Sequence, residues 1–435
     1  MRRIIHGLLP LLLLVSAAHA ERFVLEGATV FPVSAPAIDN GVVIVEDGVI
    51  VHVGAAGSGA RDGATTVDLS GRHIYPGLIA ATSSLGLTEI ASVRATIDVR
   101  EMGDHNARLH AYRAVNPDSE IIPTTRSNGV THANVVPGGS LVRGHSGLLA
   151  LDGWTWEDRL VRGPTGLHMS WPSMRLRRGD EAPPLKKQKK ERRESIHDLH
   201  TWLDDARAYL AATDAEGERG AARVDRDLEF EAWRATLDGE IPLFVHANDA
   251  RQITAAIDFA DEENLRLVIV GGRDAPRVAD GLAAADVPVI LEAVMARPAY
   301  DHEHPWTGYE RAVRLHEAGV AVAISVGSGG WLDTISRNLP FHAGMARAHG
   351  LPDDAALASV TLEPARILGV DDLMGSLEVG KRAHLIATTG DLLDIRSRVE
   401  RMWIDGREVD LDDRHKRLFR KYSERPAPAD EPDDD

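Results

Sequence analysis

The fold is decided by the stretch HIYPGLIAATSSLGLTEI, which spans His73–Ile90. Its first half is a Pro76-Gly77 turn followed by the apolar run Leu78–Ala81, a pattern typical of a short buried strand. The run ends in Thr82-Ser83-Ser84, where the residues become small and polar. In an α/β barrel, the C-terminal ends of the strands are where chemistry is done. The stretch therefore predicts a barrel strand whose end reaches a functional site.

The second half of the chain shows the same kind of strand in regular alternation with helices. Apolar strands are expected at 241–248, 265–272, 287–291 and 320–326, and helices at 250–263, 275–285 and 309–318. Near-continuous apolar strands that alternate with helices predict a parallel sheet covered on both faces. The predicted fold class is α/β, with at least four such units favouring a closed (β/α) barrel.

Short alternating strands flank this region at both ends. Residues 21–72 contain an Asp47-Gly48 hairpin turn, and residues 375–412 contain a second one at Asp405-Gly406. These two segments read as halves of a small β-domain that precedes and follows the barrel.

The stretch Tyr75–Leu85 resembles the first barrel strand of the amidohydrolase superfamily, in its imidazolonepropionase-like branch, where Pro-Gly-Leu-Ile-Asp-Ala-His-x-His supplies two metal ligands. The segment Thr361–Lys381 resembles the superfamily's C-terminal signature. The resemblance covers nearly the whole chain. It implies a TIM-like (β/α)8 barrel at 73–374 and a small β-sandwich domain built from both chain ends.

In the frame of that resemblance, most metal-ligand positions hold other residues. The two histidine positions of the first strand are Thr82 and Ser84. His246 matches the histidine of the fifth strand, whereas the sixth position falls at Gly271-Gly272 and the eighth at about Gly327. A catalytic zinc needs about three protein ligands and an open position for water. One histidine does not provide that set.

Two hypotheses follow. The first is a degenerate amidohydrolase, a pseudoenzyme that binds a small molecule or acts as a scaffold and needs no cofactor. Its cavity would be lined by residues at the strand ends, namely Thr82, Ser84, His246, Asn248, Gly271 and Gly327. The alternative is an active mononuclear hydrolase of cyclic amides or acylated amino acids, with one divalent metal such as zinc in a rebuilt site. His302 and His304 have His-x-His spacing and would join His246 there.

The N-terminus predicts export. Residues 1–20 combine Arg2-Arg3, the apolar run Leu8–Val15 and the small-x-small end Ala18-His19-Ala20, which is the form of a secretory signal peptide. We expect a mature N-terminus at Glu21 and a periplasmic or secreted protein without stable membrane insertion after cleavage. The chain has no cysteine, so no disulfide supports the fold.

The net charge of the chain limits the kinds of partner that it can bind. The formal net charge of −17 repels phosphate backbones, so we expect no nucleic-acid binding, while oligomerisation stays open. The basic linker 175–193 is either a patch for an anionic polymer or lipid headgroup, or the solvated start of a helix. Residues 413–435 are expected to form a charged tail, basic at first and acidic at the end.

Overall fold

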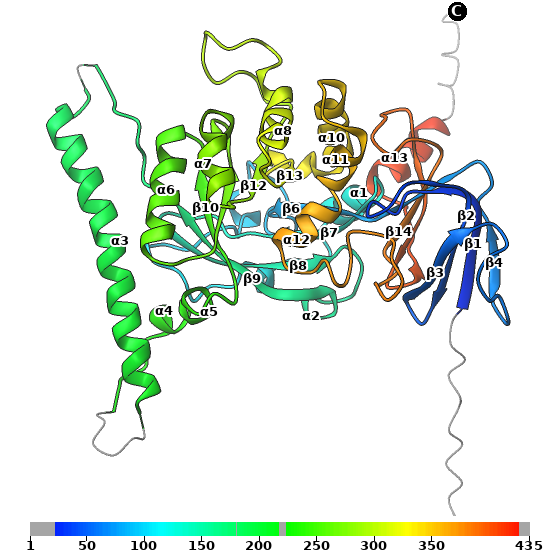
Figure 1. Ribbon diagram of the computed structural model, residues 1–435, viewed down its shortest axis with the longest axis horizontal. Coiled ribbons are helices and arrows are strands. Elements are labelled where there is room, and N and C mark those ends of the chain that lie inside the picture. Colours follow the sequence, from blue (N-terminus) through cyan, green and yellow to red (C-terminus); the bar gives the residue numbers. More distant parts are fainter. Residues whose placement is uncertain (1–21, 180, 217–222, 426–435) are drawn as a thin grey trace, which may run out of the picture.

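Two eight-stranded sheets form the framework of the chain, one a barrel and the other a separate flanking sheet (Figure 1). The computed structural model describes residues 22–179, 181–216 and 223–425. The predicted signal peptide and the acidic end of the tail lie outside these residues, so both stay predictions.

Both chain ends contribute strands to the flanking sheet. Its strands in spatial order are β16 (Arg407–Glu408), β15 (Val399–Ile404), β14 (Leu385–Thr388), β5 (His73–Pro76), β1 (Arg22–Val30), β2 (Ile38–Glu46) and β3 (Val49–Ala55), with β4 (Thr65–Asp68) paired to β1. The predicted β-domain is thus one continuous hydrogen-bonded sheet. It encloses its own apolar core, in which the Phe23 and Trp403 rings stack with centroids 6.1 Å apart.

The stretch that decides the fold divides at Gly77 between the two sheets. β5 pairs antiparallel with β14 in the flanking sheet, whereas the next strand, β6 (Leu78–Ser83), begins the barrel. A Cβ atom on Gly77 would lie 2.1 Å from Oγ1 of Thr131, so only glycine fits at this crossing. The Pro76-Gly77 turn of the sequence is therefore the point where the chain passes from one domain to the other.

The barrel sheet keeps the order of the chain. After β6 its strands are β7 (Val130–Val135), β8 (Val142–Ala150), β9 (Leu160–Ser170), β10 (Leu243–Ala247), β11 (Leu267–Gly271), β12 (Val289–Glu292) and β13 (Val322–Ser325). β6 is parallel to β7, and β9 to β13 are parallel to one another. The predicted α/β barrel is confirmed as a near-closed sheet of eight strands.

One strand departs from the expected parallel sheet. β8 runs antiparallel to both of its neighbours, β7 and β9. The connections at 136–141 and 151–159 hold only a turn and the one-turn helix α2 (Trp156–Arg159). A parallel crossover needs about a dozen residues or more, which neither connection has. Because β8 is reversed, its first residues lie at the barrel end where the other strands finish.

The barrel closes between β6 and β13 through a bridging segment. The amide of Ile79 donates to the carbonyl of Val360 at 3.0 Å, and the amide of Ile324 donates to the carbonyl of Ser359 at 2.8 Å. Ser359 and Val360 follow α11 (Asp353–Ala358) and take the place of direct pairing between the two strands.

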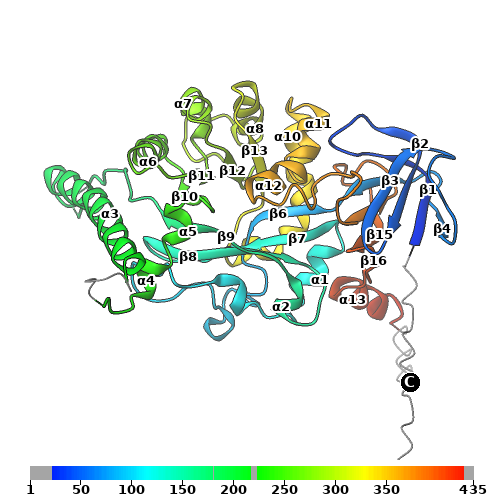
Figure 2. The same cartoon turned by 60° about the horizontal axis from the view of Figure 1, so that its bottom comes forward.

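Helices cover the side of the barrel that β10 to β13 form (Figures 1 and 2). The covering helices are α6 (Ala250–Glu262), η3 (Ala275–Val278), α7 (Ala279–Ala284), α8 (Thr307–Glu317) and α10 (Leu339–Ala348). At the floor, Ile367 of α12 (Leu362–Ile367) belongs to the same buried cluster as Phe244 inside the barrel. The shorter helices are η1 (Arg94–Thr96), η2 (Ala111–Ala114), α1 (Ile121–Arg126), α4 (Leu228–Glu231), α5 (Arg234–Leu237), α9 (Trp331–Thr334), η4 (Ser336–Asn338) and α13 (Arg414–Ser423).

The long helix α3 (Leu185–Asp214) stands at one side of the barrel, green in Figure 1. The basic stretch 175–193, for which one interpretation is the solvated start of a helix, runs into this helix: α3 begins at Leu185, so its first turns carry most of the basic residues. Leu199 and Leu203 attach the second half of the helix to the core. Among the described residues, no helix combines the length and apolar character that crossing a membrane requires.

Candidate functional site

Polar side chains gather at the end of the barrel where the parallel strands finish, which we call the mouth. Six of them form the mouth cluster: Thr82 on β6, Arg143 on β8, Ser170 on β9, His246 on β10, Glu292 on β12 and Ser325 on β13. Arg143 belongs to this group because β8 is reversed and begins at the mouth. Thr82 and Ser325 are buried, whereas Arg143, His246 and Glu292 are partly exposed.

Thr82 of β6 bonds to β12 and β13, which lie across the place where the bridging segment replaces direct strand pairing. Its hydroxyl donates to Oε1 of Glu292 at 2.7 Å. The hydroxyl of Ser325 donates to the carbonyl of Thr82 at 3.0 Å and accepts from its amide at 3.3 Å. The residue at one expected histidine position is therefore fully engaged in holding β6 against β12 and β13.

Ser84 is engaged in a similar way with Asp333 of α9. The buried carboxylate of Asp333 accepts from the amide of Ser84 at 2.8 Å and also from its hydroxyl. The same hydroxyl accepts from the amide of Gly329 at 2.8 Å. Burial raises the pKa of Asp333, and the hydrogen bonds from Ser84 oppose that shift. The second expected histidine position thus anchors the connection after β13.

His246 begins a chain of hydrogen bonds that crosses the barrel interior. Its Nε2 lies 3.0 Å from Nδ1 of His168, and Nε2 of His168 lies 2.8 Å from Oγ of Ser146. Oγ of Ser146 lies 2.7 Å from Oγ1 of Thr165, which donates to Oδ1 of Asn134 at 2.7 Å. The Asn134 amide finally donates to a carbonyl of β6, at Ala81, at 3.1 Å.

The direction of this chain follows from proton counting. Thr165 donates its one hydroxyl proton to Asn134, so in the contact with Ser146 it acts as the acceptor. Ser146 therefore donates to Thr165, and because a hydroxyl has one proton, it must accept from His168. Neutral His168 then carries its proton on Nε2, and its Nδ1 accepts from Nε2 of His246. Burial holds the pKa of both histidines well below the ordinary value, which keeps them neutral. Only Nδ1 of His246 is left as a free acceptor.

The other sequence-predicted residues lie at the same end of the barrel. Asn248 follows β10, and its Oδ1 accepts from the amide of Arg273 at 3.2 Å. A Cβ atom on Gly271 would lie 2.9 Å from the Asn248 amide, and one on Gly327 would lie 3.5 Å from the Glu292 carboxyl. The predicted lining of Thr82, Ser84, His246, Asn248, Gly271 and Gly327 is thus brought to one region. Its side chains bond to each other or to their neighbours.

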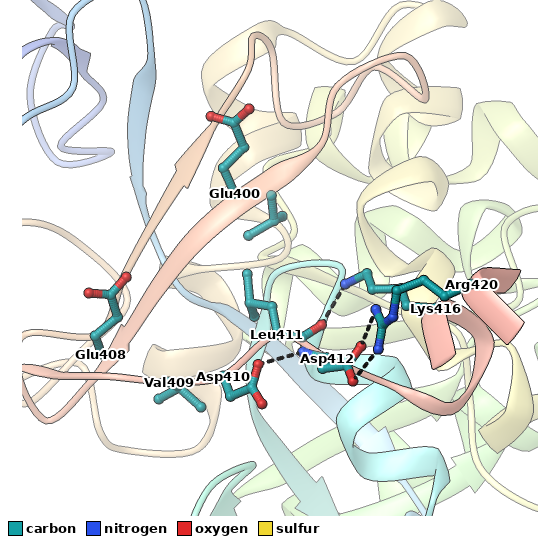
Figure 3. A pocket seen from close by; sticks show the side chains of 9 residues that line it. Glu400, Glu408, Val409, Asp410, Leu411, Asp412, Lys416 and Arg420 are labelled. Atoms are coloured by element: carbon teal, nitrogen blue, oxygen red, sulfur yellow. Dashed lines mark hydrogen bonds and ion pairs between the residues drawn. The ribbon is translucent and has the colours of Figure 1, made fainter. Parts of the chain in front are cut away.

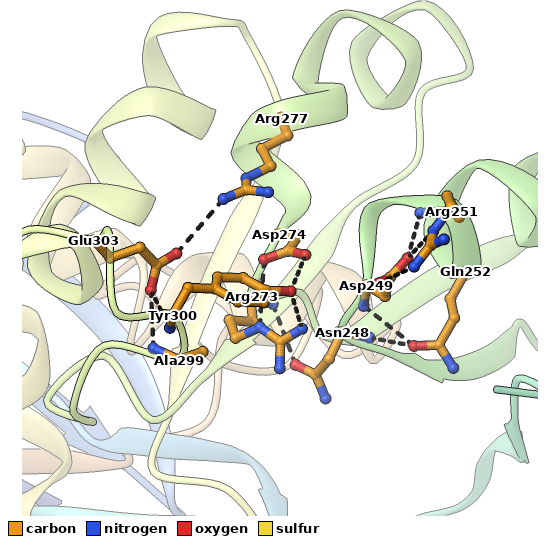
Figure 4. Close-up of polar contacts among 10 residues, drawn as sticks. All are labelled: Asn248, Asp249, Arg251, Gln252, Arg273, Asp274, Arg277, Ala299, Tyr300 and Glu303. Atoms are coloured by element: carbon orange, nitrogen blue, oxygen red, sulfur yellow. Dashed lines mark hydrogen bonds and ion pairs between the residues drawn. The ribbon is translucent and has the colours of Figure 1, made fainter. Parts of the chain in front are cut away.

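His302 and His304 do not join this region. Both are exposed on the connection between β12 and α8, where His302 stacks on Tyr300 and His304 packs on Trp306. Figure 4 shows what holds this connection: the Tyr300 hydroxyl donates to Oδ2 of Asp274 at 3.0 Å. The carboxylate of Glu303 accepts from the amide of Ala299 at 2.8 Å. Tyr300 and Glu303 are thus held by hydrogen bonds, whereas the two histidines are exposed.

The side chains at the mouth do not fit a catalytic metal ion. Within residues 22–179, 181–216 and 223–425, no three or more His, Cys, Asp or Glu side chains are grouped so that they could hold an ion. The mouth cluster offers His246 and Glu292, whereas Asp333 is committed to Ser84. The predicted alternative, a site rebuilt from His246, His302 and His304, is therefore not formed.

Sequence analysis missed four residues that organise the mouth: Arg143, His168, Ser325 and Asp333. Arg143 donates to the Ser170 hydroxyl at 2.8 Å, and burial lowers its pKa to about 10, which leaves it cationic at neutral pH. The sequence signal for Arg143 was the glycine that follows it: Gly144 has a φ of 120° and lies at a register shift of β8. His168 and Ser325 carried a weaker signal, namely polar residues in otherwise apolar strands.

Glu292→Gln should make the protein more stable at neutral and alkaline pH. Burial raises the pKa of Glu292 above 4.5, the value of the unfolded chain, although Thr82 and Arg143 oppose the shift. The folded state therefore holds this proton more tightly, and its stability is lost as pH rises through the folded pKa. Gln keeps the bond from Thr82 and does not titrate.

The measurement is the melting temperature of parent and variant between about pH 4 and 8. The two curves should meet at the acid end and separate above it. Glu317→Gln, at an exposed position of α8, is the matched control and should give no such divergence. A variant that melts below the parent at every pH would contradict the assignment.

Two hollows lie away from the mouth. One of about 560 Å³ lies beside β15, β16 and α13 and is lined by charged residues that include Glu400, Asp410 and Arg420 (Figure 3). The other, of about 1060 Å³, lies at the floor and is lined by residues that include Asp258 and Glu363. Neither is lined by a residue that the sequence predicted for the site.

Comparison with known proteins agrees with this architecture. The family model described as "Amidohydrolase family" matches residues 292–409. The amidohydrolase tasK of Hapsidospora irregularis is 23% identical over 84% of this chain, which spans only 39% of that protein. The imidazolonepropionase of Mesorhizobium japonicum is 27% identical over 80% of this chain and 86% of its own. A putative N-acetylgalactosamine-6-phosphate deacetylase of Escherichia coli is 33% identical over 28% of this chain and 65% of its own.

Among solved structures, the crystal structure of an amidohydrolase from Thermotoga maritima superimposes with a TM-score of 0.78 at 26% identity, over 89% of this chain and 99% of that one. A near-closed eight-stranded barrel with a flanking sheet from both chain ends defines the class, an amidohydrolase-type barrel. The chain is a member of the amidohydrolase superfamily.

Proposed function

We propose that this chain is a degenerate amidohydrolase of the imidazolonepropionase-like branch, a pseudoenzyme that binds a small molecule at the barrel mouth without a metal ion. The observation that carries the proposal is the state of the strand ends. Thr82, Ser84 and His246 are each bonded to another side chain, to Glu292, Asp333 and His168 respectively.

The proton on His246 supports this proposal. A metal-binding histidine presents a ring nitrogen that carries no proton. Here Nε2 of His246 donates to His168, so Nδ1 is the ring nitrogen that stays open. Binding an ion through Nε2 would break a chain of buried hydrogen bonds, and each unsatisfied buried group costs roughly 1–3 kcal/mol. Nδ1 by itself does not supply the three or so ligands that a catalytic ion needs.

The partly exposed groups of the mouth support a binding role. Arg143 supplies a cation, Glu292 an acid of raised pKa and His246 a free Nδ1 acceptor, all at the ends of barrel strands. Such convergent polar groups above an apolar barrel fix the orientation of a small ligand. The N-terminal sequence adds export to the proposal, with a mature chain that begins at Glu21 in the periplasm.

Native mass spectrometry tests metal and processing in one measurement. The full chain is expressed in a bacterial host and purified without chelator or a metal-binding tag. We expect a mass that begins at Glu21 and no stoichiometric zinc, manganese or iron. About one metal ion per chain that is absent from His246→Ala would overturn the proposal and support the hydrolase alternative. His302→Ala is the matched control, since its ring lies outside the mouth cluster.

A further inference from the structure

Arg311 of α8 is a buried cation without a partner. Only 4% of the residue is exposed, and its guanidinium makes no hydrogen bond or ion pair with the described residues. Nη2 of Arg311 is fully enclosed. Buried arginine side chains are ordinarily paired, because an uncompensated buried charge is costly. An unpaired guanidinium at this depth indicates a missing anion.

Two more guanidinium groups lie on or just before η3, the element that contacts α8. Arg273 and Arg277 follow β11, and both lie over the ring of Tyr300, each 5.2 Å from its centroid. Figure 4 shows Arg273 and Arg277 on either side of Tyr300, on the connection beside Asn248. Burial is the largest cause that lowers the pKa of Arg311; the charges of Arg273 and Arg277 lower it further, whereas those of Glu303 and Asp274 raise it. The three arginines therefore belong to one charged group that also holds these two carboxylates.

The carboxylates of this region do not neutralise all three cations. Asp274 pairs with Arg273 at 3.3 Å, and Glu303 approaches Arg277 at 3.7 Å. Both carboxylates are otherwise occupied, Asp274 by the Tyr300 hydroxyl and Glu303 by backbone amides. Two carboxylates face three guanidinium groups, so one positive charge is left over, and Nη2 of Arg311 is the buried donor without a hydrogen-bond partner among the described residues. It also lies near the start of α8, whose N-terminal end is the positive end of the helix dipole and has no side-chain cap.

We propose that Arg273, Arg277 and Arg311 form a binding site for a phosphate group at the rim of the barrel mouth. Several guanidinium groups that converge beside a helix N-terminus are the arrangement that recognises phosphate oxygens in proteins. The site goes beyond the proposed function, because it uses none of the mouth cluster. It adjoins Asn248 through the amide of Arg273, so the phosphate of a bound molecule would lie beside the mouth.

Binding of inorganic phosphate to the full-length mature protein tests the site. Calorimetry and melting temperatures are measured in phosphate, and in chloride at equal ionic strength as reference. We expect saturable binding and a melting temperature that rises with phosphate concentration. Arg311→Met should weaken the affinity about tenfold or more, since a hydrogen bond to a charged group is lost. Without phosphate, the same variant should melt above the parent, because it removes an unpaired buried charge.

Two further variants make the test specific. Arg277→Met removes a side chain that is 50% exposed, so it leaves the core intact and should also weaken phosphate binding. Arg314→Met, on the exposed face of the same helix, should bind as the parent does. The affinity for glycerol 3-phosphate shows whether the natural ligand is free phosphate or a phosphorylated molecule. If glycerol 3-phosphate binds more tightly than inorganic phosphate, the ligand is a phosphorylated molecule; if it binds more weakly, the ligand is free phosphate.

The proposal is overturned if the parent gains no more stability in phosphate than in chloride, or if Arg311→Met and Arg277→Met bind phosphate as tightly as the parent. Either result stands apart from the metal measurement, which probes His246 at the mouth. A chain that binds zinc through His246 and also phosphate through Arg311 would therefore refute the proposed function and leave this site in place.

Discussion

His168→Ala should lower the free energy of unfolding by about 3–5 kcal/mol. The side chain is fully buried, and its ring stacks on Phe244 with centroids 4.7 Å apart. Alanine removes that packing and leaves a cavity inside the barrel. It also leaves Ser146 and His246 without the partners that they have at 2.8 and 3.0 Å. Lost packing and two broken hydrogen bonds act in the same direction.

Urea-induced unfolding, followed by circular dichroism, measures this loss. His302→Ala removes the same ring from an exposed position and should change stability by no more than about 0.5 kcal/mol. The loss of unfolding free energy in His246→Ala should lie between those of the other two variants. His246 stands at the end of the hydrogen-bond chain, so its removal leaves the other bonds of the chain in place. A loss below about 1 kcal/mol for His168→Ala would mean that the network does not support the barrel.

Asp333→Ala should cost about 2–4 kcal/mol of unfolding free energy. The buried carboxylate receives both the amide and the hydroxyl of Ser84, and the hydroxyl of Ser84 in turn receives the amide of Gly329. Alanine leaves the buried amide and hydroxyl of Ser84 without their acceptor, and it frees the Ser84 hydroxyl, to which Gly329 donates, from its anchor. The connection between β13 and α9 should then separate from the end of β6.

Asp333→Asn is the informative companion. Its amide oxygen still accepts from the Ser84 amide, and the Ser84 hydroxyl is able to accept from its NH₂ group. We expect a loss of about 1 kcal/mol or less for this variant. Hydrogen exchange of the Ser84 and Gly329 amides should be faster in Asp333→Ala than in Asp333→Asn. Equal losses in both variants would show that charge, and not hydrogen bonding, is what Asp333 provides.

Much of the barrel was predictable because a short apolar run in the sequence indicates a buried strand. The expected strands at 241–248 and 265–272 contain β10 and β11, and the one at 287–291 overlaps β12, which ends one residue later at Glu292. The direction of β8 was not predictable from its residues, since alternation and β-propensity are the same for parallel and antiparallel strands. The short connections on either side were the only indication of its reversal.

The site was predictable only in part. Thr82, Ser84 and His246 were found because the resemblance to the amidohydrolase superfamily places its ligand positions at the ends of recognisable strands. Their partners were not, because contact in the fold does not follow distance along the chain: Thr82 bonds to Glu292 across 210 positions, and Ser84 bonds to Asp333 across 249. Arg311 gave no signal at all, since an arginine in an amphipathic helix reads as a solvated residue.

The reversal of β8 also decides where the protein tolerates additions. The turn before the reversed strand lies at the mouth, and the turn after it lies at the opposite end of the barrel. Trp154 stands on that second turn and is 91% exposed. A fluorescent dye or a short affinity tag at this position would be remote from the mouth. The turn is thus a natural attachment point for immobilising the chain in ligand screens while its mouth faces the solution.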